Sequence, residues 1–352
     1  MKKIFGLIKR YHAGKKLFVL VILGVAVYLI LPQITALENS WQVLTSMYLW
    51  AVGLAFIAQV LSYLGSGILL QSILAIAHQK VSLWLNTLIV FGSTSIGLIA
   101  GGTIGSSAAI YHWTSGGKDS LPPGGSMEGA TLASIFLPLF NNIILVLVSI
   151  FGLVYLIVVH SLTQNQLIGF GATLLILGLI IGGAALAVRF RIQATKAVIW
   201  ISSHVARLRR KPFNSNGTQR EMSELFDAWD TLWQGAWLRL AEGAFLNVAF
   251  DMLTLYLLFV AAGANVSLGV LLAGYAIPQL LGKVAFIIPG GVGVVESSMA
   301  VLYNGLGVPP ATTAIVVLSY RLISFWGPSL AGFPTAAYLQ RSQNRSISQE
   351  VK

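Results

Sequence analysis

Long apolar stretches dominate this sequence and limit what it can fold into. Residues 48–77 and 129–159, for example, contain no charged side chain. A helix needs about 20 apolar residues to cross the hydrocarbon core of a bilayer, so stretches of this length predict membrane-spanning helices. Only 9% of the 352 residues are charged, whereas soluble domains carry roughly 25%. The sequence therefore predicts an all-α polytopic membrane protein.

The apolar stretches divide into six predicted spans and two interrupted segments. The predicted spans are 17–31, 48–77, 129–159, 167–188, 236–262 and 311–339. The interrupted segments are 81–113 and 266–306, whose interruptions contain Gly101, Gly102 and Gly105, and Pro289, Gly290, Gly291 and Gly293. Glycine and proline break helices, and broken helices survive at membrane depth only where they face protein or a wet cavity. We expect each interrupted segment to form a re-entrant hairpin.

The distribution of basic residues agrees with this arrangement. With a cytoplasmic N-terminus and hairpins that return to their own side, the exterior loops contain no Lys or Arg; these loops are 32–47, 160–166, 262–267 and 305–310. This is the asymmetry that the positive-inside rule describes. We expect a multi-pass protein of the plasma (inner) membrane with both termini in the cytoplasm. The formal charge of +11 then reflects membrane topology, and no nucleic-acid partner is expected.

The predicted elements also form an inverted repeat. Two spans, one hairpin and one span occur in each half, with every direction reversed in the second. Repeat 1 would cover about 17–160 and repeat 2 about 166–340, within one integral membrane domain of residues 1–352. The stretch 100–105 of the first interruption corresponds to 289–293 of the second. Matching broken segments in such a repeat indicate a transporter whose binding site lies between them.

A cytoplasmic segment, 189–235, connects the first two spans of the second half, 167–188 and 236–262. It begins with a basic loop and continues into residues 221–237, where apolar side chains recur at three- and four-residue steps. This spacing predicts an amphipathic helix that lies in the membrane interface, with Trp229, Trp233 and Trp237 along its apolar edge.

The second interruption is the first candidate for a binding site. A helix that starts at Gly290, Gly291 or Gly293 would present unsatisfied N–H groups and the positive end of its dipole near the bilayer centre. These features favour an anion, for which a lipid phosphate is the obvious candidate. The alternative is that the glycines only allow neighbouring helices to pack closely.

Three charged residues near this interruption need a partner or a cavity, because charges are costly in lipid. Glu296 and Arg321, which follows Tyr320, could form an ion pair that fastens the hairpin to the last span. Alternatively, Arg321 could bind a phosphate in a bidentate manner while Glu296 positions it. Lys283 could bind the same substrate or extend toward the interface.

Asp251 lies deep in the span 236–262 and has two possible roles. It could bond to a neighbouring helix, or it could carry a proton or cation that drives transport, as could Glu296. The chain has no nucleotide-binding motif, so transport would be passive or ion-coupled. It has no cysteine, and its five histidines lack metal-ligand spacing, so we expect no metal site and no cofactor.

The residues Pro289-Gly290-Gly291-Val292-Gly293-x-x-Glu296, Gly305-Leu306-Gly307-Val308-Pro309 and Tyr320-Arg321-Leu322 carry a family resemblance. The chain resembles the lysylphosphatidylglycerol synthase transmembrane-region family, also called flippase-like domain proteins. The family includes the membrane half of the bacterial multiple peptide resistance factor, which moves aminoacylated phosphatidylglycerol between leaflets. The resemblance implies lipid handling, with the glycine break, Glu296 and Arg321 at the matching positions.

The sequence departs from the family pattern in two ways. Many members carry a proline, an acid and an arginine around the first glycine motif. Here the stretch reads Gly101-Gly102-Thr103-Ile104-Gly105-Ser106-Ser107-Ala108 and lacks them. The aminoacyl-transferase domain of the full synthases would also be absent after Lys352, which implies a stand-alone member that makes no lysyl-lipid.

The expected function is that of a lipid transporter, or flippase, that moves an anionic or aminoacylated phospholipid between leaflets. The headgroup would bind between the two hairpins, at Gly290, Gly291, Gly293, Glu296, Tyr320, Arg321 and Lys283 of the second and Gly101, Gly102, Gly105, Ser106 and Ser107 of the first. One alternative is a membrane-embedded enzyme that uses Glu296 as a general acid/base on a lipid-linked substrate. Another is an adaptor subunit that presents the tryptophan-bearing helix and the basic loop to a partner.

Overall fold

The structure, a computed structural model, describes residues 41–115, 126–159, 186–208, 215–231, 237–284 and 289–350, together with a few isolated residues between 168 and 183. These residues form helices and no strands, which confirms the all-α class. The helices are α2 (Trp41–Thr45), α3 (Leu49–Ile76), α4 (Leu83–Ala100), α5 (Thr103–Thr114), α6 (Met127–Val159), α8 (Arg191–Leu208), α9 (Ser215–Thr231), α10 (Trp237–Ala261), α11 (Leu268–Val284), α12 (Val294–Gly305), α13 (Pro310–Arg321) and α14 (Gly327–Glu350).

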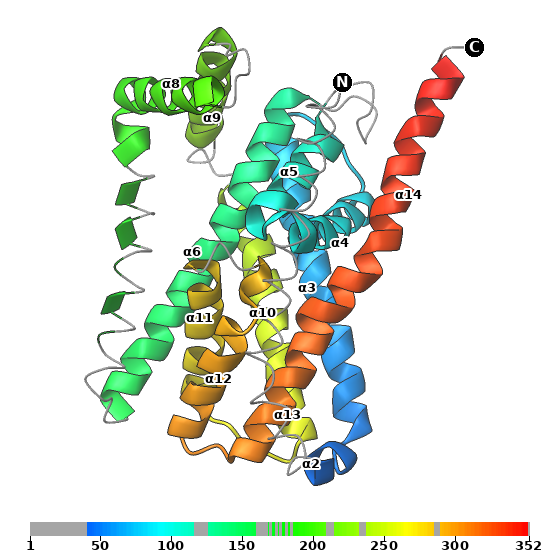
Figure 1. Ribbon diagram of the computed structural model, residues 1–352, viewed down its shortest axis with the longest axis vertical. Coiled ribbons are helices and arrows are strands. Elements are labelled where there is room, and N and C mark those ends of the chain that lie inside the picture. The colour runs from blue at the N-terminus through cyan, green and yellow to red at the C-terminus, as the bar shows by residue number, and fades with distance from the viewer. Residues whose placement is uncertain are drawn as a thin grey trace, which may run out of the picture.

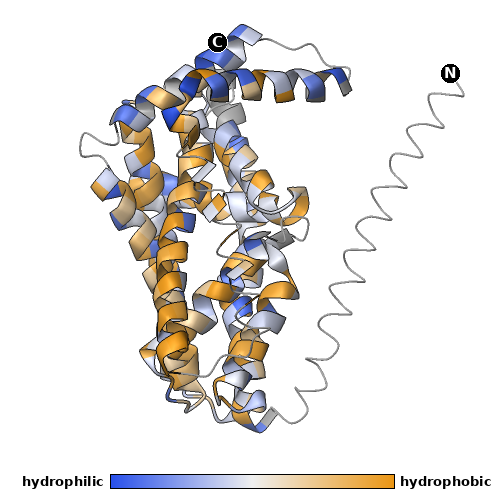
Figure 2. Cartoon of the chain, turned by 90° about the vertical axis from the view of Figure 1, so that its left-hand side faces the viewer, coloured by the Kyte–Doolittle hydropathy of each residue, from blue (hydrophilic) through white to orange (hydrophobic). Residues whose placement is uncertain are grey.

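Five helical stretches within the described residues are long and apolar enough to cross a membrane, namely Leu49–Ile76, Leu83–Ala100, Met127–Val159, Trp237–Ala261 and Pro310–Arg341. Four of them coincide with predicted spans. The fifth is α4, the first half of the first interrupted segment, whose 18 residues suffice on their own. The predicted span 17–31 lies wholly outside the described residues, and half of the predicted span 167–188 does. Figure 2 shows hydrophobic residues along the bundle and hydrophilic ones gathered at the end where α8 and α9 lie.

Helices α3 and α10 lie antiparallel along each other at very short range. A Cβ atom on Gly65 of α3 would lie 2.5 Å from the backbone nitrogen of Asn247 in α10, so only glycine allows this approach. The Asn247 side chain donates to the Ser62 carbonyl at 3.1 Å, and the Ser62 hydroxyl donates to the Asn247 carbonyl at 3.0 Å. These reciprocal bonds tie the two helices together in the apolar interior.

Both interrupted segments fold back on themselves as pairs of helices. In the first, Gly101 and Gly102 join α4 to α5, and Gly97 faces Ser106 across the pair. In the second, Gly282 of α11 faces Val295 of α12. The two pairs enter from opposite ends of the bundle, and their tips meet in the middle (Figure 1). A Cβ atom on Gly102 would lie 3.8 Å from the nitrogen of Gly290. The predicted helix–break–helix form is present, whereas a re-entrant placement in a bilayer stays a prediction.

Each folded-back pair packs against the last helix of the other half. Helix α4 lies along α14, where the Ser95 hydroxyl donates to the Ser329 carbonyl at 2.6 Å. Helix α11 lies along α6, where a Cβ atom on Gly152 would be 2.6 Å from the nitrogen of Ala273. This exchange is the one that an inverted repeat predicts, and the repeat itself stays a prediction.

The amphipathic helix α9 differs from its expected position. It runs over Ser215–Thr231, and Trp237 is instead the first residue of α10; Trp233 lies outside the described residues. The Trp229 ring packs on Phe136 of α6 at a centroid distance of 6.4 Å. Arg191, the first residue of α8, forms an ion pair with Asp230 at 2.5 Å. The apolar face of α9 thus packs, through Trp229, on α6 of the same chain.

Candidate functional site

A cavity of about 350 Å³, lined by polar and apolar groups, lies where the two folded-back pairs meet. Residues from both breaks line it, together with side chains from α6, α10, α11 and the α13–α14 region. A second cavity of about 240 Å³ adjoins it and shares Tyr63, Asn141 and Asp251. The interior of the bundle therefore holds polar space at the level of both breaks.

The two breaks are built on the same local plan. Each ends in a glycine with positive φ that caps a 12-residue helix: Gly102 (φ 65°) before α5 and Gly293 (φ 83°) before α12. Four residues later a serine hydroxyl donates back to the carbonyl of that glycine, from Ser106 in α5 and from Ser297 in α12. A residue with a Cβ would be strained in these backbone conformations, which explains glycine at both caps.

This geometry corrects the alignment of the two motifs. The sequence comparison placed 100–105 against 289–293, which pairs Gly105 with Gly293. The helix starts instead pair Gly102 with Gly293, and therefore Gly105 with Glu296. The two breaks share the pattern Gly-x-x-x-Ser-Ser, at Gly102 and at Gly293. The additional glycines in 289–293 made this pattern hard to recognise.

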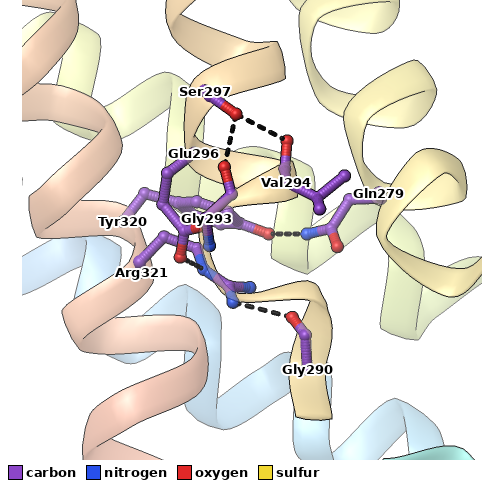
Figure 3. A network of polar contacts seen from close by, with 8 residues as sticks. All are labelled: Gln279, Gly290, Gly293, Val294, Glu296, Ser297, Tyr320 and Arg321. Carbon is purple, nitrogen blue, oxygen red and sulfur yellow. Dashed lines mark hydrogen bonds and ion pairs between the residues drawn. The ribbon is translucent and has the colours of Figure 1, made fainter. Parts of the chain in front are cut away.

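Glu296 and Arg321 form an ion pair at the second break, with an Arg321 Nε to Glu296 Oε1 distance of 2.6 Å (Figure 3). Each side chain is only 4% exposed. The other Glu296 oxygen accepts the Gly293 N–H at 2.6 Å, and a terminal nitrogen of Arg321 donates to the Gly290 carbonyl at 2.8 Å. The guanidinium also lies 4.3 Å from the centre of the Phe325 ring. The pair fastens the tip of the second hairpin to α13, as one of the two sequence hypotheses proposed.

Asp251 lies at the centre of a second polar network. Its Oδ2 accepts hydrogen bonds from the hydroxyls of Tyr320 at 2.7 Å and Tyr275 at 2.8 Å. Gln279 in turn donates to the Tyr320 hydroxyl at 2.7 Å. The network joins α10, α11 and α13, and Asp251 faces both cavities.

Lys283 differs from the other charged residues of the site. It lies near the end of α11, is an exposed residue and lines the larger cavity. No described residue forms an ion pair or hydrogen bond with its ammonium group. Lys283 is therefore a cation available to a ligand in the cavity.

Most predicted site residues come together in this region. Those lining the larger cavity are Gly101, Gly102, Ser106, Asp251, Lys283, Gly290, Gly291, Tyr320 and Arg321, and Ser107 lines the smaller one. Gly105 packs against Ala100, and Gly293 and Glu296 lie behind the lining. Among the described residues, no three acidic or histidine side chains gather as a possible metal site.

Sequence reasoning missed Tyr275 and Gln279. A signal was present, because Tyr275, Gln279 and Lys283 recur at four-residue steps and share one face of α11. Polar side chains on one face of an otherwise apolar helix indicate a face turned toward a cavity.

The known proteins that this chain resembles are membrane proteins. The family described as the lysylphosphatidylglycerol synthase TM region matches residues 17–332. A UPF0104 membrane protein of Methanothermobacter thermautotrophicus is 32% identical over 108 residues, which are 31% of this chain and 32% of that protein. UPF0104 membrane proteins of Methanocaldococcus jannaschii and Pyrococcus horikoshii are 32% and 34% identical over 27% and 25% of this chain, and 28% and 26% of their own lengths. The matched stretches thus span about a third or less of these relatives.

Proposed function

Because this chain belongs to the family of the lysylphosphatidylglycerol synthase transmembrane region, we propose that it moves a phospholipid between the two leaflets of a membrane. The chain is a multi-pass membrane protein with five helical stretches long and apolar enough to cross a bilayer among its described residues. The observation that carries the proposal is the cavity between the two breaks, with several polar side chains and the unpaired Lys283 in its wall. A lipid headgroup is the part of a phospholipid that needs such a polar path.

The size of the cavity suits this role. Ligand cavities usually measure about 300–1,000 Å³, and the larger cavity alone reaches about 350 Å³. The outer faces of the helices remain apolar, with side chains such as Phe151 and Leu253 exposed. The headgroup would occupy the cavity while the acyl chains stay in the surrounding lipid.

Asp251 is the better of the two candidates for ion coupling. Glu296 is held by Arg321 and by the Gly293 N–H, so a proton would have to displace two charge-assisted bonds. Asp251 faces both cavities and accepts bonds from neutral hydroxyls that would tolerate its protonation. An enzymatic role for Glu296 is weakened as well. A general acid/base must reach its substrate, whereas both Glu296 oxygens are bonded within the protein and the residue does not line the cavity.

The two ends of the bundle support one orientation in the membrane. The loops 262–267 and 305–310, which lack Lys and Arg, lie at the end opposite α8, α9 and the C-terminus (Figure 1). We place this end outside the cell and the termini in the cytoplasm of a plasma (inner) membrane protein. Since the chain has no cysteine, Gly307→Cys and His78→Cys should react with a membrane-impermeant thiol reagent from opposite sides. Reaction of both from one side would contradict this orientation.

Lipid transfer in proteoliposomes tests the function directly. Labelled phosphatidylglycerol and phosphatidylcholine would be followed between leaflets for the parent chain and for Lys283→Gln. Lys80→Gln is the matched control, because it makes the same change on an exposed residue between α3 and α4. We expect the parent to accelerate transfer, Lys283→Gln to remove most of the acceleration, and Lys80→Gln to retain it. A folded parent that accelerates no lipid, with or without a pH gradient, would overturn the proposal, and chemically altered lipid would indicate the enzyme instead.

A further inference from the structure

The N-terminus of α5 opens into the cavity without a capping side chain. Its first intrahelical bond runs from the Ser106 N–H to the Gly102 carbonyl at 3.1 Å, so the N–H groups of Thr103, Ile104 and Gly105 have no acceptor within the helix. Thr103 and Ile104 are exposed and line the larger cavity. The positive end of a 12-residue helix thus faces polar space.

The equivalent end of α12 is already neutralised by the protein. Glu296 stands three residues after the glycine cap, and its carboxylate accepts the Gly293 N–H. Arg321 binds the same carboxylate and the carbonyl of Gly290. The second break therefore contains its own anion, whereas the first has Gly105 at that position.

Several further groups in the cavity wall are without partners, among them the acceptor Asn141 Oδ1 and the two donors Ser329 and Lys283. The Ser329 side chain is 1% exposed, lines the larger cavity, and its hydroxyl oxygen has no hydrogen-bond partner. Buried polar atoms without a partner are uncommon, and an oxygen-rich ligand would accept the hydroxyl's hydrogen bond. Lys283 supplies the unpaired positive charge.

We infer that the N-terminus of α5, Lys283 and Ser329 form a phosphate-binding subsite at the first break, and that Glu296 fills the corresponding position at the second. The inference rests on the proposed function and moves the phosphate away from Arg321. The ligand chemistry is that of a phosphate ester, in a lipid headgroup or in a soluble compound. Asp251 is the one carboxylate among the described lining residues, and two tyrosine hydroxyls already donate to it.

The test places a carboxylate where the phosphate would bind. Thr103→Asp would put a negative charge at the start of α5, much as Glu296 does in α12, and Thr103→Asn is the uncharged variant of nearly equal size. The purified full chain in detergent would be titrated with dihexanoyl phosphatidylglycerol and with glycerophosphoglycerol. We expect Thr103→Asp to weaken binding about tenfold relative to Thr103→Asn, which corresponds to a repulsion at a helix terminus. Lys283→Gln should weaken it by a similar factor, and Ser329→Ala by about threefold.

The outcomes separate the inference from the function on which it rests. Equal affinities for Thr103→Asp and Thr103→Asn, in a parent chain that transfers lipid between leaflets, would overturn the subsite and leave the transporter standing. A parent chain that neither transfers lipid nor binds either compound would overturn both. Comparable binding of the two compounds would show that the phosphate ester suffices, and binding of the short-chain lipid alone would assign the subsite to lipid headgroups.

Discussion

The two breaks share a backbone plan and differ in how their helix ends are satisfied. Both have a glycine cap and a serine four residues later that donates back to it. At the second break a buried carboxylate and a guanidinium complete the structure. At the first, Gly105 replaces the carboxylate and the helix end faces the cavity.

This difference separates structural from binding roles. The second break carries the more conspicuous sequence motif and the charged residues, yet those charges bind one another. The first break has no charged residue between Gly101 and Ser107, and its backbone N–H groups remain available. In the proposed subsite, the motif rich in charge is self-contained, and the half without charged residues takes the ligand.

The ion pair at the second break should give the largest effect on stability. Removing one partner of a buried pair leaves the other charge uncompensated and typically costs about 3–5 kcal/mol. We expect Arg321→Met and Glu296→Gln each to lower the free energy of unfolding by this amount, and the double variant to lose less than the sum. Thermal unfolding in detergent measures it, with Lys283→Met as the unpaired-cation control. Single variants no less stable than this control would contradict a structural role for the pair.

Alanine at the break glycines should have unequal effects. At Gly290 (φ 64°) a Cβ atom would lie 2.1 Å from the Phe325 ring, so Gly290→Ala combines backbone strain with overpacking and should cost about 2–4 kcal/mol. At Gly101 (φ 93°) a Cβ atom meets open space, so Gly101→Ala should cost about 1 kcal/mol from strain alone. Unfolding midpoints of the two variants under identical conditions make the comparison. Equal losses would show that the first break is packed as tightly as the second.

The two serines that donate back to the cap glycines should behave alike if the backbone plan is shared. Ser106→Ala and Ser297→Ala each remove one hydroxyl bond to a glycine carbonyl, and each should cost about 0.5–1.5 kcal/mol. The same unfolding measurement tests this, with Ser298→Ala as a control beside the second serine. A clear difference between the two variants would break the equivalence of the two caps.

The α8–α9 ion pair gives a reference far from both breaks, and the smallest effect. Arg191 holds the pKa of the Asp230 carboxyl below its usual value, chiefly through their hydrogen bond. Because the folded pKa is lowered, the contribution of the pair is complete above the unfolded value of about 4 and is lost as pH falls through the folded pKa. The protection of the α9 amides against hydrogen exchange should therefore fall below pH ~4 in the parent. Arg191→Gln should lower this protection already at pH 7. Exchange in α5 and α12 should not respond, and a response there would link this pair to the breaks.

The fold could be predicted further than the site. The lengths of the apolar stretches predicted four of the described spans, and the glycine clusters predicted both breaks. Both signals are local in the sequence. The partners of Asp251 could not be predicted, since Tyr275 and Tyr320 reach it from helices 24 and 69 residues away. The availability of Lys283 and the engagement of Arg321 also depend on how the hairpin tips pack. The amphipathic spacing of α9 was visible, but not the surface of α6 that it covers.

The exchange of packing partners between the halves has a consequence for the order in which the molecule is made. Helix α4 packs against α14, which is synthesised much later, because the Ser95–Ser329 contact spans 234 residues. The first hairpin therefore lacks this neighbour while the residues between α4 and α14 are translated. Its packing is complete only when α14 arrives, so removal of α14 should disturb a hairpin that was synthesised much earlier.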